Sequence, residues 1–304
     1  MDEASPLSNA RLLLLGDVAV PEWQKSIPAL QSGVLSGMTV VFNLEGPVLK
    51  NRMAIPVSRA KHNLSNAAET IGKFNSQNTL VSVANNHYQD FRDHDVLSPD
   101  KLGAYAFGTR DNPVQSLDLA GEKIVVAAFS FPAPDPLRWR HAAESLNVLT
   151  PSQALRFLEI TRADHKDAKL IAFVHWGYEL SALPFAADRA WARQAAALGV
   201  DFVIGHHPHV VQPVERFEKT LVAYSLGNFF LPEGFWHGKP LTYSGAGEKG
   251  LAIGLSEGGV ELFAVTSGEI DLDRPIEGDT LAPEFTGYDD TRYRRYFSSK
   301  DRKS

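Results

Sequence analysis

The sequence predicts an α/β fold that contains parallel strands and more than one sheet. Five apolar runs of four to six residues, rich in Val, Leu, Ile or Phe, have the composition of strands that are buried on both faces. Helical segments between these runs indicate a sheet with right-handed crossovers. Two further segments have the pattern of hairpins, which predicts a second sheet. The five runs are Arg11–Leu15, Thr39–Phe42, Thr79–Val83, Lys169–Val174 and Asp201–Ile204.

Three helices and two hairpins complete the predicted elements. Asn66 and Glu69 have the spacing of a capping box, and Pro151 suits the first position of a helix. Turn residues at 120–121 and 257–258 join the strands of the two hairpins. The predicted helices are Ser65–Gln77, a segment that opens at Thr150, and Phe185–Leu198, and the predicted hairpins are Val114–Ser130 and Lys249–Ser267.

Composition restricts the class of partner. The chain has 304 residues, of which 44% are hydrophobic and 22% charged, so it can bury a sizeable core. A formal net charge of -6 argues against a broad nucleic-acid or anionic-membrane surface, and a small partner is expected instead. Because the chain has no cysteine, a metal site must use His, Asp, Glu or Asn.

Residues 1–280 are expected to form a single domain, and 281–304 a partly disordered tail. The apolar run near the N-terminus is too short for the core of a signal peptide or for a membrane span. The sequence as written therefore predicts a cytoplasmic protein without a membrane span. A form trimmed of a membrane anchor would have the same features, so that alternative stays open.

Polar side chains stand at the carboxyl end of each apolar run. In open α/β sheets, ligands bind beyond the carboxyl ends of the strands, so these side chains are expected to converge on one crevice. The five clusters are Asp17; Asn43 with Glu45; Asn85, Asn86 and His87; His175; and His206, His207 and His209.

Each cluster also has a structural explanation when it is taken alone. Asp17 could cap a helix, Glu45 could complete a turn, and a single histidine such as His175 is more often a hydrogen-bonded core residue than a ligand. Three histidines within 206–209 are harder to explain by packing. Because five such coincidences at strand ends are improbable together, the sequence favours a metal site.

The residue types indicate which metals would bind. Two carboxylates, an amide and several imidazoles suit a binuclear Mn, Fe or Zn site better than a calcium site or a structural zinc site. Two metals about 3.5 to 4 Å apart could share a hydroxide that attacks a phosphoryl or acyl group. Glu45 is the expected bridging carboxylate. His87 directly follows the proposed ligand Asn86, which would place it over the site as the acid that protonates a leaving group.

Taken together, these motifs resemble a bacterial capsule-synthesis family, the poly-γ-glutamate capsule or CapA-like proteins, which is related to calcineurin-like metallophosphoesterases. The resemblance spans about residues 11 to 256 in the same order. The motifs are Gly16-Asp17, Asn43-Leu-Glu-Gly-Pro47, Ala84-Asn-Asn-His87 with Asp90, His175-Trp-Gly177, Gly205-His-His-Pro-His-Val210 and Tyr224-Ser-Leu-Gly-Asn-Phe229.

The resemblance implies a four-layer α/β/β/α sandwich, in which two mixed sheets are covered by helices. It also implies the roles of the site residues. Asp17 and His209 would hold one metal, Asn86, His175 and His207 would hold the other, and Glu45 would bridge the two. His87 corresponds to the catalytic histidine of the superfamily.

One departure from the superfamily pattern concerns the first metal. The superfamily opens with Asp-x-His, whereas Asp17 is followed by Val18 and Ala19. The first site would bind its metal weakly, recruit His206 or Asn43, or stay empty, and Asn85 is a further candidate ligand or supporting residue.

Three residues outside the ligand set are candidates for substrate binding. Arg59 and Lys61 could hold an anionic group, although solvated loop cations are the structural alternative. Asn228 follows a further predicted strand, Leu221–Tyr224, and could line the crevice or merely finish a turn.

The expected function is a metal-dependent, phosphoesterase-like hydrolase in the synthesis of a capsule or exopolymer, either poly-γ-glutamate or polysaccharide. In that role, a metal-activated hydroxide would attack a phosphoester. The expected partners are a small phosphorylated or polymer-end substrate and components of a capsule synthase. The alternatives are a non-catalytic polymer-binding or assembly factor of a capsule synthase, and a γ-glutamyl amide hydrolase with the same site.

Overall fold

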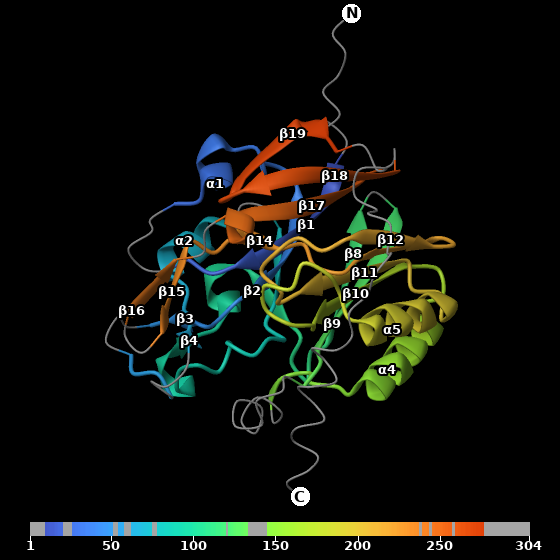
Figure 1. Ribbon diagram of the computed structural model, residues 1–304, viewed down its shortest axis with the longest axis horizontal. Helices are drawn as coiled ribbons and strands as arrows, with labels where there is room; N and C mark the ends of the chain where they lie inside the picture. The colour runs from blue at the N-terminus through green and yellow to red at the C-terminus, as the bar shows by residue number, and fades with distance from the viewer. Residues whose placement is uncertain are drawn as a thin grey trace, which may run out of the picture.

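Two large sheets pack face to face, with helices on both outer faces (Figure 1). The computed structural model describes residues 10–20, 26–50, 54–57, 62–74, 78–119, 121–132, 145–236, 239–242, 245–256 and 259–276. The predicted tail over 281–304 lies outside these residues, so the boundary at 280 stays a prediction.

The first sheet has eight strands and includes the first three of the five predicted runs. Its strands pair in the order β19-β18-β17-β1-β2-β5-β7, and β14 pairs with β1 beyond that path. β1, β2, β5 and β7 are parallel to one another, and β17, β18 and β19 form an antiparallel edge. The bounds are β1 Ala10–Val18, β2 Thr39–Leu44, β5 Thr79–Ser82, β7 Tyr105–Phe107, β14 Asn228–Phe230, β17 Lys249–Ser256, β18 Gly259–Thr266 and β19 Glu269–Pro275.

The second sheet has six strands and includes the other two runs. Its order is β12-β13-β11-β10-β9-β8, in which β13, β11, β10 and β9 are parallel. Both predicted hairpins are confirmed, one in each sheet. The bounds are β8 Val114–Leu119, β9 Glu122–Ser130, β10 Lys169–His175, β11 Phe202–His206, β12 Val214–Phe217 and β13 Thr220–Ala223.

Small elements complete the described part of the chain. The smaller sheets contain β3 Val48–Leu49, β4 His62–Asn63, β6 Val96–Leu97, β15 Glu233–Trp236 and β16 Lys239–Thr242. The helices are α1 Pro28–Ser32, α2 Ala68–Lys73, α4 Pro151–Asp164 and α5 Ala186–Ala197, with short 3-10 turns η3 Asp93–Asp95, η4 Pro99–Leu102 and η5 Gly245–Glu248. Within the described ranges, none of these helices combines the length and the apolar character of a membrane span.

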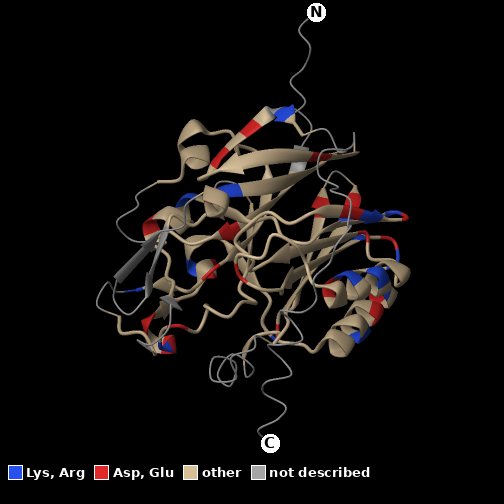
Figure 2. Cartoon of the chain, in the orientation of Figure 1, with Lys and Arg blue, Asp and Glu red and all other residues tan. Residues whose placement is uncertain are grey.

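Alternation along the strands explains the layers. Because successive side chains of a strand point to opposite faces, β1 places Leu12 and Leu14 between the sheets and Leu13 and Leu15 against the outer layer. Strand β9 does the same in the second sheet, where Val125, Ala127 and Phe129 pack beneath α4 and α5. The four-layer α/β/β/α arrangement implied by the family resemblance is confirmed. Charged side chains gather on α4, on α5 and at sheet edges (Figure 2).

Two of the three predicted helices agree with the structure, and the third differs at its start. Thr150 caps α4 through the backbone N–H of Gln153, as the Pro151 pattern predicted. The predicted capping box at Asn66 is wrong, because α2 begins at Ala68 and the Asn66 side chain bonds elsewhere. Its amide oxygen accepts the N–H of Val20, 46 residues away, so a distant contact displaced the local one.

Candidate metal centre

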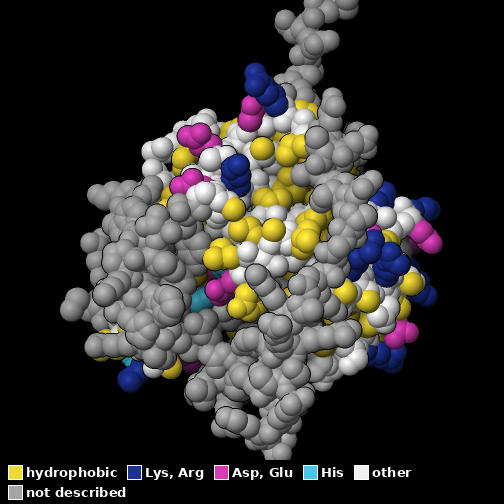
Figure 3. Space-filling model, viewed as in Figure 1, with side chains coloured by type: hydrophobic (Ala, Val, Ile, Leu, Met, Phe, Trp, Pro, Cys, Tyr) yellow, Lys and Arg dark blue, Asp and Glu magenta, His cyan; other side chains and the backbone are white. Residues whose placement is uncertain are grey.

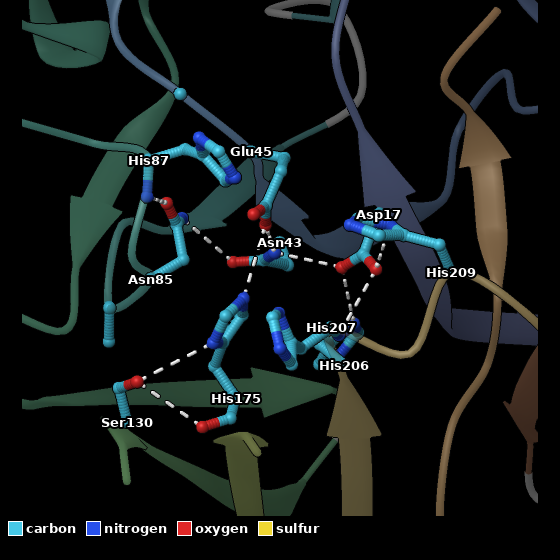
Figure 4. A network of polar contacts seen from close by, with 12 residues as sticks. Asp17, Asn43, Glu45, Asn85, His87, Ser130, His175, His206, His207 and His209 are labelled. Atoms are coloured by element: carbon cyan, nitrogen blue, oxygen red, sulfur yellow. Dashed lines mark hydrogen bonds and ion pairs between the residues drawn. The ribbon is translucent and has the colours of Figure 1, made fainter. Parts of the chain in front are cut away.

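The ends of five strands from both sheets bring the predicted polar clusters together (Figure 4). The first sheet contributes the residues at the ends of β1, β2 and β5, and the second sheet those at the ends of β10 and β11. The site is therefore formed between two sheets and not along one. The side chains drawn together are Asp17, Asn43, Glu45, Asn85, His87, His175, His206, His207 and His209.

Glu45, His175 and His207 form a group that could hold a metal ion. Each offers one donor atom, all three atoms lie within 4.8 Å of one another, and all three side chains are buried. The Glu45 Oε2 atom is 3.4 Å from His175 Nε2. The rings of His175 and His207 are adjacent, with centroids 4.6 Å apart. One carboxylate and two imidazoles are ligands that suit Zn, Fe or Mn.

Two members of this group are in the protonation state that binds metal. Burial alone would raise the pKa of Glu45, but the charge and the hydrogen bond of His175 lower it to about 2. Burial and the neighbouring His175 lower the pKa of His207 to about 3. Near neutral pH, Glu45 is therefore an anion and His207 a neutral imidazole, which are the forms that coordinate metals.

Asp17 is completely buried at a point where the pairing of β1 shifts register. A register shift of this kind turns a side chain away from the regular pleat. The carboxylate receives hydrogen bonds from Asn43 Nδ2 at 2.8 Å and from the backbone N–H of His207 at 3.2 Å. The ring nitrogens of His206 and His209 also lie 3.2 Å from it, each beside a different carboxylate oxygen.

His209 pairs with Asp17. Its Nδ1 atom lies 2.9 Å from the side-chain oxygen of Asn228, and the side-chain nitrogen of Asn228 donates to the carbonyl of Gly247. Burial would lower the pKa of His209, but the Asp17 carboxylate raises it to about 9. In the same way, burial opposes ionisation of Asp17, and the neighbouring His206 and His209 hold its pKa well below 3.8. Near neutral pH the two form a buried ion pair.

The backbone that carries these histidines is strained. His207 has a φ of 97° and His209 a φ of 56°, both in the left-handed region that side chains with a Cβ avoid. Such conformations persist only where the surrounding structure holds them, and they concentrate at functional sites. The three histidines of 206–209 end a regular strand and turn at once into the site.

His87 forms a buried pair with Asp90. Its Nδ1 atom lies 2.6 Å from Asp90 Oδ2, and this carboxylate oxygen also accepts the backbone N–H of Leu64. The ring of His87 lies beside the Glu45 side chain (Figure 4). The imidazole is therefore held at one nitrogen by a carboxylate that is itself fixed.

Asn43 and Asn85 connect the carboxylates to the His87 segment. The Asn43 amide nitrogen donates to Asp17 and to Glu45, and its oxygen accepts the amide of Asn85 at 3.1 Å. The Asn85 oxygen then accepts the backbone N–H of His87. The sequence predicts both residues as additional ligands or supporting residues, and the choice between these two roles stays a prediction.

Sequence patterns missed two residues that shape the site. Ser130 ends β9, and its hydroxyl lies 3.5 Å from His175 Nδ1 and donates to the His175 carbonyl. The polar residue that ends an apolar run is the same signal that identified the other clusters. Asn66 holds the Glu45 turn, since its amide donates to the carbonyls of Glu45 and Gly46. No local signal distinguishes that role from helix capping.

The structure gives fewer contacts for the remaining predicted site residues. Asn86 is buried next to His87, and its role as a ligand stays a prediction. Arg59 and Lys61 lie outside the described residues, so their substrate contacts also stay predictions. Asn228 belongs to β14 and binds His209, as described above.

A buried imidazole nitrogen tests whether a metal would fit. Within the donor set, Nδ1 of His207 is buried and has no hydrogen-bond partner among the described residues. A buried polar atom without a partner is costly and needs an explanation, which a bound ion would supply. The donor set of Glu45, His175 and His207 therefore fits a divalent metal.

Relatives support the assignment of a family. PGA biosynthesis protein CapA of Bacillus subtilis (strain 168) is 27% identical over 208 residues, which cover 64% of this chain and 54% of that protein. Capsule biosynthesis protein CapA of Bacillus anthracis is 35% identical over 66 residues, 22% of this chain and 16% of that protein. The chain thus spans about half the length of the Bacillus subtilis relative.

The solved structures are less similar in sequence to this chain. A hypothetical protein from Thermus thermophilus has a TM-score of 0.46 and 18% identity, covering 88% of this chain and 96% of that one. The calcineurin-like phosphoesterase YfkN from Bacillus subtilis has a TM-score of 0.38 and 14% identity, covering 97% of each chain. The layer order itself comes from the strand pairing described above.

The family model described as bacterial capsule synthesis protein PGA_cap matches residues 20–233, which include every proposed ligand except Asp17. This match covers more than half of the chain, and it agrees with both named relatives. The chain belongs to the bacterial capsule synthesis protein PGA_cap family.

Proposed function

We propose that this chain is a metal-dependent hydrolase of phosphoesters that acts in the synthesis of a capsule or exopolymer. One observation carries the hydrolase part: the Glu45, His175 and His207 donors and the buried His87–Asp90 pair occupy a single cluster of strand ends. Membership of the capsule-synthesis family supports the biological setting.

Glu45, His175 and His207 would hold the metal, with Asn86 as a further candidate ligand. When bound, a divalent metal supplies Lewis-acid activation of an ester oxygen and of water. The chain's own contribution is to present the ionised Glu45 carboxylate and the neutral His207 imidazole in a buried setting. Burial keeps these ligands ordered and limits competition from bulk water.

His87 would act as the general acid that protonates the leaving oxygen. Its Nδ1 atom is engaged by Asp90, which leaves Nε2 as the nitrogen that can exchange a proton with a substrate. The Asp90 carboxylate fixes both the ring orientation and the tautomer. The hydrogen bonds of Asn43 and Asn85 connect the His87 backbone to the two carboxylates of the site.

An apolar rim would contact the part of the substrate that does not react. The segment directly after His175 exposes Tyr178 and Leu180, which are 48% and 64% accessible. Leu180 donates its N–H to the carbonyl of Pro208, so this rim is attached to the histidine turn. Figure 3 has histidine atoms at the bottom of a hollow, beside an acidic side chain and near apolar ones.

The test is hydrolysis of an aryl phosphomonoester and an aryl phosphodiester by purified chain loaded with Mn, Fe or Zn. His87→Ala and His207→Ala should abolish turnover. His94→Ala is the matched control, because the His94 side chain is 70% exposed and belongs to η3, which contributes none of the strand ends of the site.

The other outcomes separate the alternatives. Turnover of a γ-glutamyl amide without turnover of either ester would support amide hydrolysis by the same residues. Full metal loading with no turnover of any of the three substrates would contradict the hydrolase and favour a polymer-binding or assembly role.

A further inference from the structure

The contacts of Asp17 differ in kind from those of the Glu45 group. We infer that Asp17 anchors the turn of residues 206–209, and that the chain holds one metal ion, at Glu45, His175 and His207, and not two. This inference rests on the proposed metal centre and specifies its stoichiometry.

The first argument is distance. Ligands of one ion at about 2.0–2.2 Å cannot lie more than about 4.4 Å apart. The donors of Glu45, His175 and His207 all lie within 4.8 Å of one another, so small side-chain movements would bring them within this limit. Within the described ranges, no second group of three carboxylate or imidazole donors comes as close together.

The second argument is the arrangement around the Asp17 carboxylate. His206 Nδ1 lies beside Oδ1 and His209 Nδ1 beside Oδ2, so the carboxylate separates the two imidazoles. Asn43 Nδ2 and the backbone N–H of His207 also donate to it, one to each oxygen. A carboxylate has about four acceptor positions, and four nitrogens surround this one. A metal at Asp17 would have to enter among these four nitrogens, and the side-chain amide of Asn43 and the backbone N–H of His207 already donate to the carboxylate.

The third argument concerns the position two residues after Asp17. Ala19 is 1% exposed and packs with Leu64 and Leu231 in a small apolar cluster. Val18 belongs to the outer hydrophobic core. Neither the Val18 nor the Ala19 side chain can bind a metal. The leucines that pack against Ala19 carry no metal-binding group either.

The fourth argument is the strain of the turn. His207 and His209 hold left-handed backbone angles, and Asp17 contacts residues 206, 207 and 209 at once. The backbone of Asp17 is itself fixed, since its N–H donates to Gly227 at 3.0 Å. Asp17 thereby holds the turn in the shape that presents His207 to Glu45 and His175. It is a positioning residue.

The experiment measures Mn(II) bound to the full chain, by elemental analysis after dialysis and by the EPR spectrum of the bound ion. The expected result is one Mn(II) per chain with the spectrum of an isolated ion. Two Mn(II) per chain with exchange coupling would overturn the inference and leave the proposed hydrolase standing. No bound Mn(II), Fe or Zn would overturn the metal centre, and the single-metal inference with it.

Variants distinguish between two roles for Asp17, positioning the 206–209 turn and binding the metal. Asp17→Asn should keep one Mn(II) per chain while its Kd rises about 10–100-fold, the usual effect of losing a residue that orients a ligand. His207→Ala should lose the ion. A fall from two ions to one in Asp17→Asn would make Asp17 a ligand. If Asp17→Asn does not fold, which circular dichroism would reveal, the stoichiometry of the unaltered chain decides the question.

Discussion

The Nδ1 atom of His87 lies 2.6 Å from Oδ2 of Asp90, and both side chains are 1% exposed. The two residues are three positions apart, so one short segment carries both the imidazole and the carboxylate that orients it. Leu64 donates its N–H to the same oxygen, which holds the carboxylate against rotation. An imidazole held at Nδ1 in this way has only Nε2 left for proton transfer.

Loss of His87 or of Asp90 should lower turnover of an aryl phosphoester without loss of metal. General acid catalysis contributes about 10²–10⁴-fold, so His87→Ala should lower kcat by that factor. Asp90→Asn should lose much of this contribution to kcat, because an amide can favour the wrong tautomer of His87. Asp93→Asn, at an exposed position nearby, is the control. A normal kcat in Asp90→Asn would exclude the orienting role.

Metal should stabilise the chain through His207. A ligand that binds only the folded state adds about 2.7 kcal/mol when its concentration is 100 times its Kd. Removal of metal with a chelator should therefore lower the Tm by several degrees, as measured by differential scanning calorimetry. His207→Ala should show no difference with or without metal, whereas His94→Ala should behave like the unaltered chain. An equal metal effect in His207→Ala would contradict its role as a ligand.

The buried pair of His209 and Asp17 should make the metal-free chain lose stability in alkali. The pKa of His209 is raised from 6.5 to about 9 in the folded state, after burial has opposed the rise, because of Asp17. The resulting stabilisation is fully present below pH 6.5 and is lost as the pH rises through 9. It amounts to roughly 3 kcal/mol. Asp17 stays ionised throughout this window, since its pKa lies well below 3.8.

Urea unfolding with a chelator at several values between about pH 6 and pH 10 checks this prediction. The difference in unfolding free energy between the unaltered chain and His209→Gln should shrink with rising pH, because glutamine does not titrate. The exposed variant His94→Gln serves as control. A difference that stays constant over this range would show that His209 is not held as a cation.

The sequence was sufficient to identify ten of the fourteen strands of the two large sheets and to group the polar side chains at the strand ends. Strands such as β10 and β11 are buried on both faces, so they appear as continuous apolar runs. Their last residues, His175 and His206, are polar because they leave the core at that point. Since parallel strands end at the same edge, residues far apart in the chain could be grouped without knowledge of their contacts.

Other features depend on pairings that a sequence pattern does not encode. The runs proved to belong to two sheets, because apolar periodicity shows that a strand is buried but not which strand it pairs with. Asn66 has the local pattern of a helix cap, yet it bonds Val20 and the Glu45 turn. The unusual φ of His207 also escapes prediction, since non-glycine residues rarely adopt it.

The exposed rim after His175 should affect substrate binding more than chemistry. Leu180→Ser removes an apolar side chain that is 64% exposed, while the backbone N–H that binds Pro208 remains. We expect KM for a large ester to rise several-fold with kcat unchanged, the pattern of lost uniform binding. Ile160→Ser, on the exposed face of α4, is the matched control. An unchanged KM would place the substrate elsewhere.

Gly205 should tolerate no side chain, although its backbone angles are ordinary. A Cβ at this position would overlap the carbonyl oxygen of Tyr224 and the indole nitrogen of Trp176, which are hydrogen-bonded to each other at 2.9 Å. Gly205→Ala must therefore break that bond or move the end of β11. Overpacking of this kind costs about 1–3 kcal/mol, and the shift should also weaken metal binding because His206 and His207 follow directly.

Gly72→Ala is the matched control, since it lies within α2 and a Cβ there would meet no atom within 4 Å. It should stabilise the chain by about 0.5–1 kcal/mol, because alanine favours the helix. Urea unfolding and Mn(II) titration of both variants check the contrast. If Gly205→Ala kept both its stability and its Kd for Mn(II), the close approach of Trp176 would not be what positions the histidine turn.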